Sequence, residues 1–536
     1  MRIRMITTMT PTPENIRGTS ALPYHLLKGL ICPPSPLKGE LQNGSQTPTL
    51  AKSPQAPLKG GVQSGSQTPP QTPPLCERGG EIPNSPFRGL GEQRGLLEQG
   101  LAGQDVDVVV YTFNNNGVSD EQMREVEREL DVTIKVVPLP WWFKFVFKFH
   151  LLFIRLFLKY PIHHYIKLPQ EFVQEIKDSK PDLIWVYGAE WSRVTRQFEG
   201  FQRIHTLPDS EALYYYRMLG QRFVARDWKK FWRCALMYPK FLRLERNFPT
   251  NDNIHYHLVG EEDANFLTQM NPGIQAHFIR HPHYEVAERG PIRFHRPKIR
   301  LLIAGQYNLY MQQTADEVLE WIIGTESPSP PKSPLKRGTS CSGSKTELPP
   351  LQGGLGGAAS QAVHAARRVP TMPLGTPPAS GGDGGGLSHY TITFLGKGWE
   401  RHVEALRSMG VEVNHIKFAP DYIEEVIKHD IQVTPITIGT GTKGKVLDAL
   451  ANGLLVLGTP YAMENIAVEH GSSCMVWRTP QELLQVLQDI PQRIEHYEQM
   501  AEAGRQAVLE HHNREKIARK LFGLMPYGQK SNENLK

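Results

Sequence analysis

Cysteine, net charge and uninterrupted apolar runs are all scarce in this sequence. Five cysteines are spread over 536 residues without a Cys-x-x-Cys spacing, so the sequence predicts neither a zinc site nor a disulfide framework. A formal charge of +6 is small for this length and argues against a general nucleic-acid-binding protein. Met1–Thr7 resembles a strand and lacks the apolar core of a signal peptide, so we expect a protein of the reducing cytoplasm.

Proline and glycine are concentrated in two tracts, residues 33–95 and 325–388, which share variants of the phrase Pro-Leu-Lys. Such a composition without a period predicts disorder. The tracts could carry a proline-rich docking ligand, or they could be a repetitive insertion tolerated in loops. Each separates an expected helix from the next strand, and that connection lies opposite the ligand side of a parallel sheet. We therefore expect both tracts to be silent in catalysis.

Outside these tracts, strand-like and helix-like segments alternate in two blocks, which predicts an α/β fold with two Rossmann-like parallel-sheet domains facing a cleft. The expected boundaries are 1–285 for an acceptor domain, 286–505 for a nucleotide-sugar-binding domain, and 506–536 for a helix returning to the first domain and a tail. The expected strands are 2–7, 106–111, 133–137, 183–187, 203–207 and 255–259 in the first block, and 299–304, 391–395, 412–416, 431–436 and 454–458 in the second.

The segment Gly439–Gly453 combines a glycine turn, two lysines and a helix start. The first N–H groups of a helix have no partner inside it, and the helix dipole favours an anion there. Lys443 and Lys445 add two charges at the same end, and Asp448 stands one turn further on, where a carboxylate could bind sugar hydroxyls. The segment predicts a site for a diphosphate and its ribose, although an ordinary strand–turn–helix with solvated lysines is the alternative.

The pattern Gly-Thr-Lys-x-Lys-x-Leu-Asp-Ala-x-Ala-x-Gly from Gly441 to Gly453, with Glu464-Asn-Ile466 beyond it, resembles the donor-sugar region of retaining family 4 (family 1-like) glycosyltransferases. This resemblance implies the two-domain GT-B fold and a nucleotide-diphospho-sugar as donor substrate, without a further cofactor or a metal. The donor-binding residues that it implies are Gly305, Asn308, Gly441, Thr442, Lys443, Lys445, Asp448, Glu464, Asn465 and Ile466.

The sequence also departs from this family. Many members have an arginine just after the first glycine turn of the second domain and a lysine a few residues on, where this chain has Gln306 and no lysine before the helix. Many also have a glutamate eight residues before the ribose carboxylate, where this chain has Thr440. The ribose position itself is Asp448 rather than glutamate. Neutralisation of the phosphates would then depend mainly on Lys443 and Lys445, which we expect to be catalytic, and on the helix amides.

Three residues of the first domain could face the same cleft. Gly18 follows the first strand, where it could be a ligand-binding turn or a purely structural one. His205 and Asp209 lie at the end of a later strand and could contact acceptor or donor sugar, which makes them catalytic candidates. A buried histidine with satisfied hydrogen bonds and a helix-capping aspartate are the alternatives.

Residues 141–160 form an aromatic and basic segment that predicts a membrane-surface helix. Lys144, Lys148, Arg155 and Lys159 fall within about 60° of one another on a helical projection, and most of the remaining surface is apolar. Spanning a bilayer would bury these charges, whereas lying in its interface would not. We expect attachment to an anionic membrane surface, at the inner face of the plasma membrane; a helix packed on the sheet is the alternative.

No metal site is predicted. The Asp105–Asp107 pair resembles a metal-binding pattern but falls at the start of a strand, on the far side of the sheet. The His281/His283 and His511/His512 pairs lack acidic or cysteine partners at ligand spacing.

These features predict a glycosyltransferase that moves a sugar from a nucleotide-diphospho-sugar to a glycan or lipid-linked acceptor, with retention and without a metal. A nucleotide-sugar epimerase of the same fold is one alternative, and the membrane-surface segment argues against it. A catalytically silent scaffold at the membrane is the other, and it is kept open by the missing arginine, lysine and glutamate.

Overall fold

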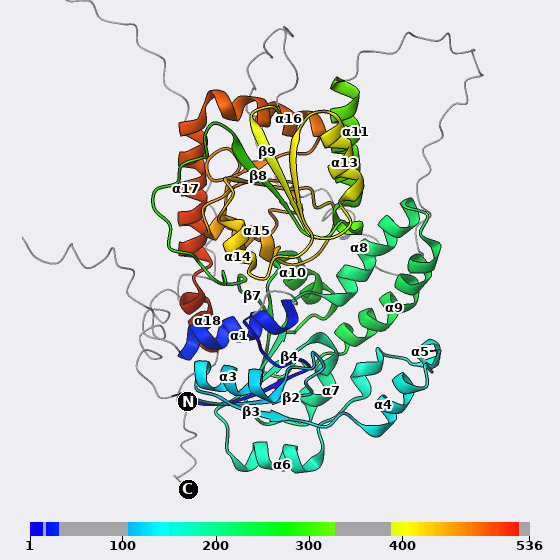
Figure 1. Ribbon diagram of the computed structural model, residues 1–536. Coiled ribbons are helices and arrows are strands. Elements are labelled where there is room, and N and C mark those ends of the chain that lie inside the picture. The colour runs from blue at the N-terminus through cyan, green and yellow to red at the C-terminus, as the bar shows by residue number, and fades with distance from the viewer. Residues whose placement is uncertain (14–17, 32–105, 152, 327–386, 525–536) are drawn as a thin grey trace, which may run out of the picture.

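The computed structural model describes residues 1–13, 18–31, 106–151, 153–326 and 387–524. Two parallel sheets, of seven and six strands, each pack with helices to form two domains (Figure 1). The predicted α/β fold with two Rossmann-like domains in the GT-B arrangement is therefore confirmed. The tract 33–95 and all but the ends of the tract 325–388 lie outside the described residues.

The first sheet has the strand order β3-β2-β1-β4-β5-β6-β7. Its strands are β1 (Arg2–Thr7), β2 (Asp107–Thr112), β3 (Thr133–Val136), β4 (Leu183–Tyr187), β5 (Arg203–Leu207), β6 (Ile254–Leu258) and β7 (Ala276–Phe278). The helices of this domain are α1 (Gly18–Ile31), α3 (Asp120–Leu130), α4 (Trp141–Lys148), α5 (Ile154–Phe157), η2 (Ile162–Tyr165), α6 (Gln170–Asp178), η3 (Ala189–Trp191), α7 (Ser192–Arg196), α8 (Glu211–Val224), α9 (Trp228–Arg246) and α10 (Glu261–Met270).

The second sheet has the strand order β10-β9-β8-β11-β12-β13. Its strands are β8 (Ile299–Ala304), β9 (Tyr390–Leu395), β10 (Glu412–Ile416), β11 (Ile431–Thr434), β12 (Leu455–Gly458) and β13 (Met475–Val476). The helices that follow the strands are α11 (Leu309–Glu326), α13 (Glu400–Ser408), α14 (Tyr422–Val426), α15 (Gly444–Ala451), α16 (Pro480–Asp489), η4 (Ile490–Gln492), α17 (Ile494–His511) and α18 (Arg514–Phe522).

The strand order of the second sheet reverses between β8 and β11, which pair with each other. In an open α/β sheet the loops after two such strands diverge and leave a crevice for a ligand. The Gly305 turn follows β8, and the segment that begins at Gly439 follows β11. Two segments far apart in the sequence are therefore brought to the same end of the second sheet.

The segment 141–160 is not the single helix that its periodicity predicts. Helix α4 ends at Lys148, His150 adopts a left-handed φ of 54°, and Leu151 N–H donates to Val146 O at 2.9 Å, a common way to close a helix. The break lets Leu151 and the short helix α5 turn back onto the first domain, whereas a straight helix would leave that apolar surface in water. None of the helices among the described residues is long and apolar enough to cross a membrane.

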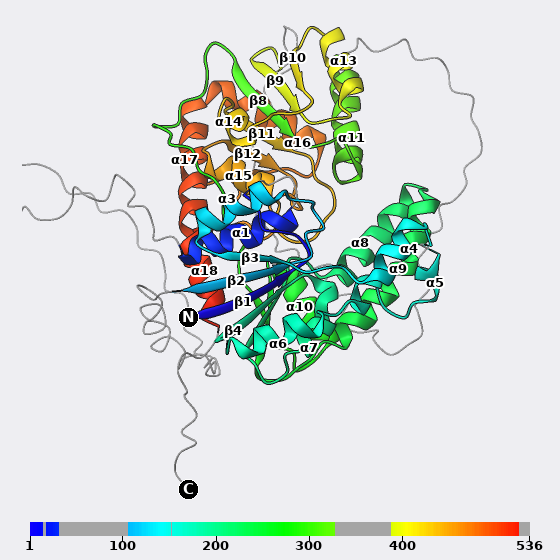
Figure 2. The same cartoon turned by 60° about the horizontal axis from the view of Figure 1, so that its bottom comes forward.

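The end of the chain crosses back to the first domain. Helix α17 ends at His511, and α18 packs against α1 (Figures 1 and 2), where Leu521 and Phe522 join the core of the first domain. The packing is close, because a Cβ on Gly29 of α1 would lie 2.6 Å from Arg514 O. The return expected for residues 506–536 is thus made by α18, while α17 lies along the second domain.

Buried histidines line the crossing between the domains. His512 Nδ1 lies 2.7 Å from His281 O, its Nε2 accepts from Ala467 N–H at 3.1 Å, and His283 N–H donates to His512 O at 2.8 Å. Both ring nitrogens are thereby used by a neutral imidazole. Burial lowers the pKa of His512 to about 3 and that of His281 to about 4.

We expect the folded protein to lose stability as the pH falls below about 6.5, because these histidines bind protons in the unfolded chain well before they do so in the fold. Each such group contributes roughly 1.4 kcal/mol per pH unit in that window. His512→Gln should lower the thermal midpoint at pH 7.5 and flatten its fall between pH 7.5 and 5. His511→Gln, at the exposed neighbouring position, is the control and should keep the wild-type slope. An unchanged slope in His512→Gln would contradict this account of the crossing.

Candidate functional site

The glycine segment forms a tight loop at the start of α15. Gly439 and Gly441 have φ values of 148° and 63°, which a residue with a side chain rarely adopts. Lys443 occupies the N-cap position of α15, and its ammonium donates to the carbonyl oxygens of Thr440 (3.1 Å) and Gly441 (2.8 Å). It also lies 3.5 Å from Glu464 Oε2. Lys443 therefore folds back over its own loop, and only 12% of its side chain is exposed.

Lys445 meets the turn that follows β8. A Cβ on Gly305, whose φ is 131°, would lie 3.3 Å from Lys445 Nζ. The Lys445 side chain keeps an exposed surface but is surrounded by both loops. The partial loss of its hydration lowers its pKa, and the nearby charge of Asp448 acts in the opposite direction. Gly305 and Lys445, 140 positions apart in the sequence, are thus brought together at the strand-order reversal.

The first domain closes over the glycine loop. Gly441 N–H donates to Asp263 Oδ2 at 3.3 Å, and Thr442 Oγ1 donates to Val259 O at 3.1 Å. Asp263 is buried at the start of α10, and its other oxygen accepts from Ser210 N–H at 2.9 Å. Asp209 also lies against this loop, because a Cβ on Gly441 would lie 1.9 Å from its Oδ1. One buried carboxylate therefore joins the start of α8 to the loop of the second domain.

Arg217 is a functional candidate that the sequence analysis missed. Its Nη1 donates to Gly439 O at 2.6 Å, and its Nη2 lies 3.5 Å from Glu464 Oε1 and also contacts Glu262. Ser210 caps α8, and Arg217 comes seven residues after it, on the same helical face. The capping serine after β5 could have revealed this position. Arg217 therefore brings a guanidinium to the glycine loop, beside the Lys443–Glu464 pair.

Glu464, Asn465 and Ile466 have three different environments. Glu464 lies between Lys443 and Arg217, and 14% of its side chain is exposed. Asn465 has a left-handed φ of 65°, and its Oδ1 accepts from the N–H of Glu261 in the first domain at 3.0 Å. Ile466 is buried in the core beneath α15. Of these three, Glu464 presents a charged group to the glycine loop.

Carboxylates and cations are intermixed in this site. Burial raises the pKa of Asp209, Glu464 and Asp263, the last to about 7. The positive charges of Lys443 and Arg217 act in the opposite direction and lower the pKa of both Asp209 and Glu464. Asp209 Oδ1 is buried without a hydrogen bond to the described residues. Ser210 rather than Asp209 caps α8. Asp209 therefore does not have the helix-capping role that was the alternative for it.

Other predicted residues lie at the edge of this cluster or away from it. Asp448 is on α15 but only 1% exposed, and its role toward ribose stays a prediction. Asn308 Oδ1 accepts from Tyr310 N–H at 3.1 Å at the start of α11. Gly18 is the first residue of α1. His205 is fully buried between Phe248 and Tyr256.

His205 is buried, as in the structural alternative, but its Nδ1 has no hydrogen-bond partner among the described residues. Its Nε2 lies 2.7 Å from Gly188 O, and burial lowers its pKa to about 4. The strand around it is buried at every position, which keeps the ring inside the first domain. A contact of His205 with a sugar stays a prediction without support from this geometry.

A cavity of about 880 Å³ lies between the α8–α9 hairpin and the start of α11. Gly220, Lys230, Asn308 and Gln312 are among its lining residues. Among the residues that the structure describes, no group of three histidine, cysteine or acidic side chains could hold a metal ion. The site therefore offers ammonium and guanidinium groups, backbone amides and an adjoining cavity.

Residues 385–523 match the sequence family described as Glycosyl transferase-like. This range contains the glycine loop, α15 and Glu464, together with most of the second domain. The match and the two-domain fold confirm the predicted class, a glycosyltransferase of the GT-B type. No curated protein sequence matches the chain.

Three solved structures have a similar overall arrangement. HepE from Anabaena, solved with UDP and glucose, is 9% identical over 78% of this chain and 91% of its own, with a TM-score of 0.44. Sucrose-phosphate synthase from Thermosynechococcus elongatus is 12% identical over 81% and 92%, with a TM-score of 0.44. A glycosyltransferase from Rickettsia africae is 10% identical over 81% and 94%, with a TM-score of 0.43. Likeness of this degree says nothing about the substrate of the present chain.

We expect Gly441→Ala to weaken the contact between the domains, because the new Cβ would overlap the Asp209 carboxylate. Gly117→Ala is the matched control, since Gly117 has a φ of 66° and open space around it. Both changes carry the strain of a left-handed alanine, about 1–2 kcal/mol. Gly441→Ala should lower the thermal midpoint further than Gly117→Ala and should also reduce nucleotide-sugar binding about tenfold or more. Equal losses in the two variants would contradict the cross-domain contact.

Proposed function

We propose that this protein transfers a sugar from a nucleotide-diphospho-sugar to a glycan or lipid-linked acceptor, with retention and without a metal. The observation that carries the proposal is the convergence of the Gly305 turn, Lys445 and the Lys443 loop at the strand-order reversal of the second sheet. Such a position suits a diphosphate, because helix amides and two ammonium groups meet there. The cavity beside Asn308 gives the acceptor a route to the same loops.

In the proposed reaction the bond between the sugar and the diphosphate breaks, and its electron pair stays on the phosphate oxygen. The acceptor hydroxyl forms the new bond to the sugar, and its proton leaves with the departing nucleoside diphosphate. Lys443 and Lys445 stabilise the negative charge that grows on the diphosphate, and fixed charges of this kind lower the barrier more than they favour the bound substrate. Arg217 adds a third cation beside Lys443.

Donor binding has to change the contacts of Lys443. In the described structure its ammonium is shared by two carbonyl oxygens and Glu464, all within 3.5 Å. A phosphate oxygen would take the place of one or more of these acceptors. Glu464 would then be free to accept hydrogen bonds from donor hydroxyls. Asp209 is a first-domain carboxylate beside the same loop, since a Cβ on Gly441 would lie 1.9 Å from its Oδ1.

Nucleotide sugars should raise the thermal midpoint of the protein, and Lys443→Ala, Lys445→Ala and Arg217→Ala should each weaken that effect. A hydrogen bond to a charged group contributes about 1.5–3 kcal/mol, so we expect a ten- to roughly hundredfold loss of affinity for each variant. The measurement is a thermal-shift titration with UDP-, GDP- and ADP-sugars, followed by assays for released nucleoside diphosphate. Lys516→Ala, an exposed lysine on α18, is the control.

The outcome also distinguishes the alternative functions. Release of nucleoside diphosphate together with an unchanged sugar configuration at the new bond supports transfer, whereas an epimerised sugar supports the epimerase. If no nucleotide sugar binds, both enzymatic functions are wrong, and the catalytically silent scaffold is the function that remains.

We also propose that the protein attaches to the inner face of the plasma membrane through α4 and α5. Trp141 is 78% exposed and Phe157 82% exposed, while Lys144 and Lys148 lie exposed on the same segment. Residues 141–160 contain no acidic side chain. Exposed rings beside cations suit the interface of an anionic bilayer better than water.

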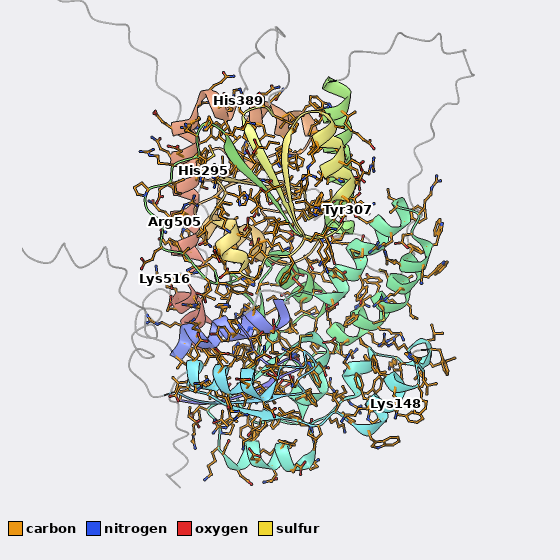
Figure 3. All side chains as sticks on the ribbon, in the orientation of Figure 1. Lys148, His295, Tyr307, His389, Arg505 and Lys516 are labelled. Carbon is orange, nitrogen blue, oxygen red and sulfur yellow. The ribbon has the colours of Figure 1, made fainter. Side chains whose placement is uncertain are left out.

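Lys144→Ala/Lys148→Ala should weaken sedimentation with anionic phospholipid vesicles by roughly tenfold or more, since each juxtamembrane cation contributes about 1 kcal/mol. The matched control is Lys516→Ala/Lys520→Ala, because those two exposed lysines are also four residues apart on one helix. Figure 3 labels Lys148 and Lys516 at opposite edges of the molecule. Equal binding of both double variants, or no binding by the wild type, would refute this attachment.

A further inference from the structure

The α8–α9 hairpin ends in a cluster of aromatic side chains that no other described element covers. Phe223, Trp228 and Trp232 are 52%, 50% and 67% exposed. The Phe231 ring contacts all three, edge to face with Trp228 and Trp232 and tilted against Phe223, at centroid distances of 5.4–6.0 Å. Phe223 and Trp228 also meet edge to face, at 5.8 Å. The cluster is therefore an ordered surface rather than a set of separate exposed residues. Exposed apolar clusters of this kind mark interaction sites.

The same tip is strongly basic. Residues 222–233 contain five arginines and lysines and a single carboxylate, Asp227. That carboxylate is already occupied, because it pairs with Arg222 and Lys230, each at 3.1 Å, and caps α9. The tip as a whole presents rings surrounded by cations, which suits a partner with an anionic surface and an apolar interior.

The tip continues the surface of α4 and α5. The ammonium of Lys240 on α9 donates to Arg155 O, and Arg243 Nη1 donates to Lys159 O at 3.0 Å. Near the tip, the charge of Arg233 adds to burial in lowering the pKa of Arg155. In both Figure 1 and Figure 2, α4, α5 and the end of the hairpin lie along the same edge of the molecule.

We propose that the α8–α9 tip is a second contact with an anionic lipid bilayer, which inserts Phe223, Trp228 and Trp232 between the headgroups. The charge of the tip and its continuity with α4 and α5 favour a bilayer over another protein. The inference deepens the proposed function. The 880 Å³ cavity is lined by the hairpin on one side and by Asn308 on the other, so the tip holds the mouth of the cavity at the bilayer, where a lipid-linked acceptor resides.

The test compares vesicle sedimentation of the wild type, a tip variant and two controls. The tip variant is Phe223→Ser/Trp228→Ser/Trp232→Ser, whose three positions do not line the cavity. Phe418→Ser/Tyr461→Ser removes two exposed rings of the second domain (68% and 46% exposed). Vesicles contain phosphatidylglycerol and phosphatidylcholine, or phosphatidylcholine alone. We expect the tip variant to bind the anionic vesicles about tenfold or more weakly, and the second-domain variant to bind as the wild type does.

A second measurement keeps the test independent of folding. The conservative Trp228→Phe/Trp232→Phe variant should lose part of the tryptophan quenching caused by brominated lipids, while its thermal midpoint and its stabilisation by nucleotide sugars stay at wild-type values. Unchanged quenching would overturn the insertion of the tip.

The remaining outcomes separate this inference from the proposed function. If Lys144→Ala/Lys148→Ala loses vesicle binding and the tip variant does not, membrane attachment stands and the tip inference falls. If the wild type binds no vesicles, both the membrane attachment and the tip inference are wrong. Donor binding is measured without lipid, so that result does not affect it. If the wild type dimerises in solution and the tip variant does not, the tip is a contact between copies, which overturns the bilayer as its partner.

Discussion

The hydrogen bonds of Asp263 are the constraint on which the arrangement of the site depends. This one buried carboxylate accepts from the start of α8 in the first domain and from Gly441 in the second. Its position fixes the glycine loop against Asp209 and brings Arg217, two turns along α8, to the same loop. The hydrogen bonds of Thr442 to Val259 and of Glu261 to Asn465 join the same two domains beside this link.

Much of the fold could be predicted from the sequence, because a buried parallel strand leaves a local signal. The runs 2–7, 183–187, 203–207, 299–304 and 412–416 have in the structure the bounds that their apolar pattern predicts. The short edge strands β7 and β13 have too few residues for a pattern. The segment 141–160 has a long helical pattern, but that pattern does not reveal where tertiary packing will break the helix.

The candidate site was predictable only in its local part. Lys443, Lys445 and the glycine turn share one stretch of chain, so their spacing indicates their chemistry. The contributions of Arg217 and Asp263 depend on how the two domains pack, which no local spacing encodes. The role of His205 was open for a related reason: a histidine on a strand can face a cleft or a core, and here it lies among Phe248 and Tyr256.

The pairing of Lys443 with Glu464 gives the glycine loop its own counter-ion. An ammonium already neutralised by a carboxylate 3.5 Å away attracts small free anions only weakly, since any such anion must compete with a partner at high effective concentration. A ligand that also contacts the turn after β8 and the cavity gains binding energy from those contacts. That energy can offset the competition with Glu464 for the Lys443 ammonium. Under the proposed function, the glycine loop would favour phosphate that arrives as part of a larger molecule.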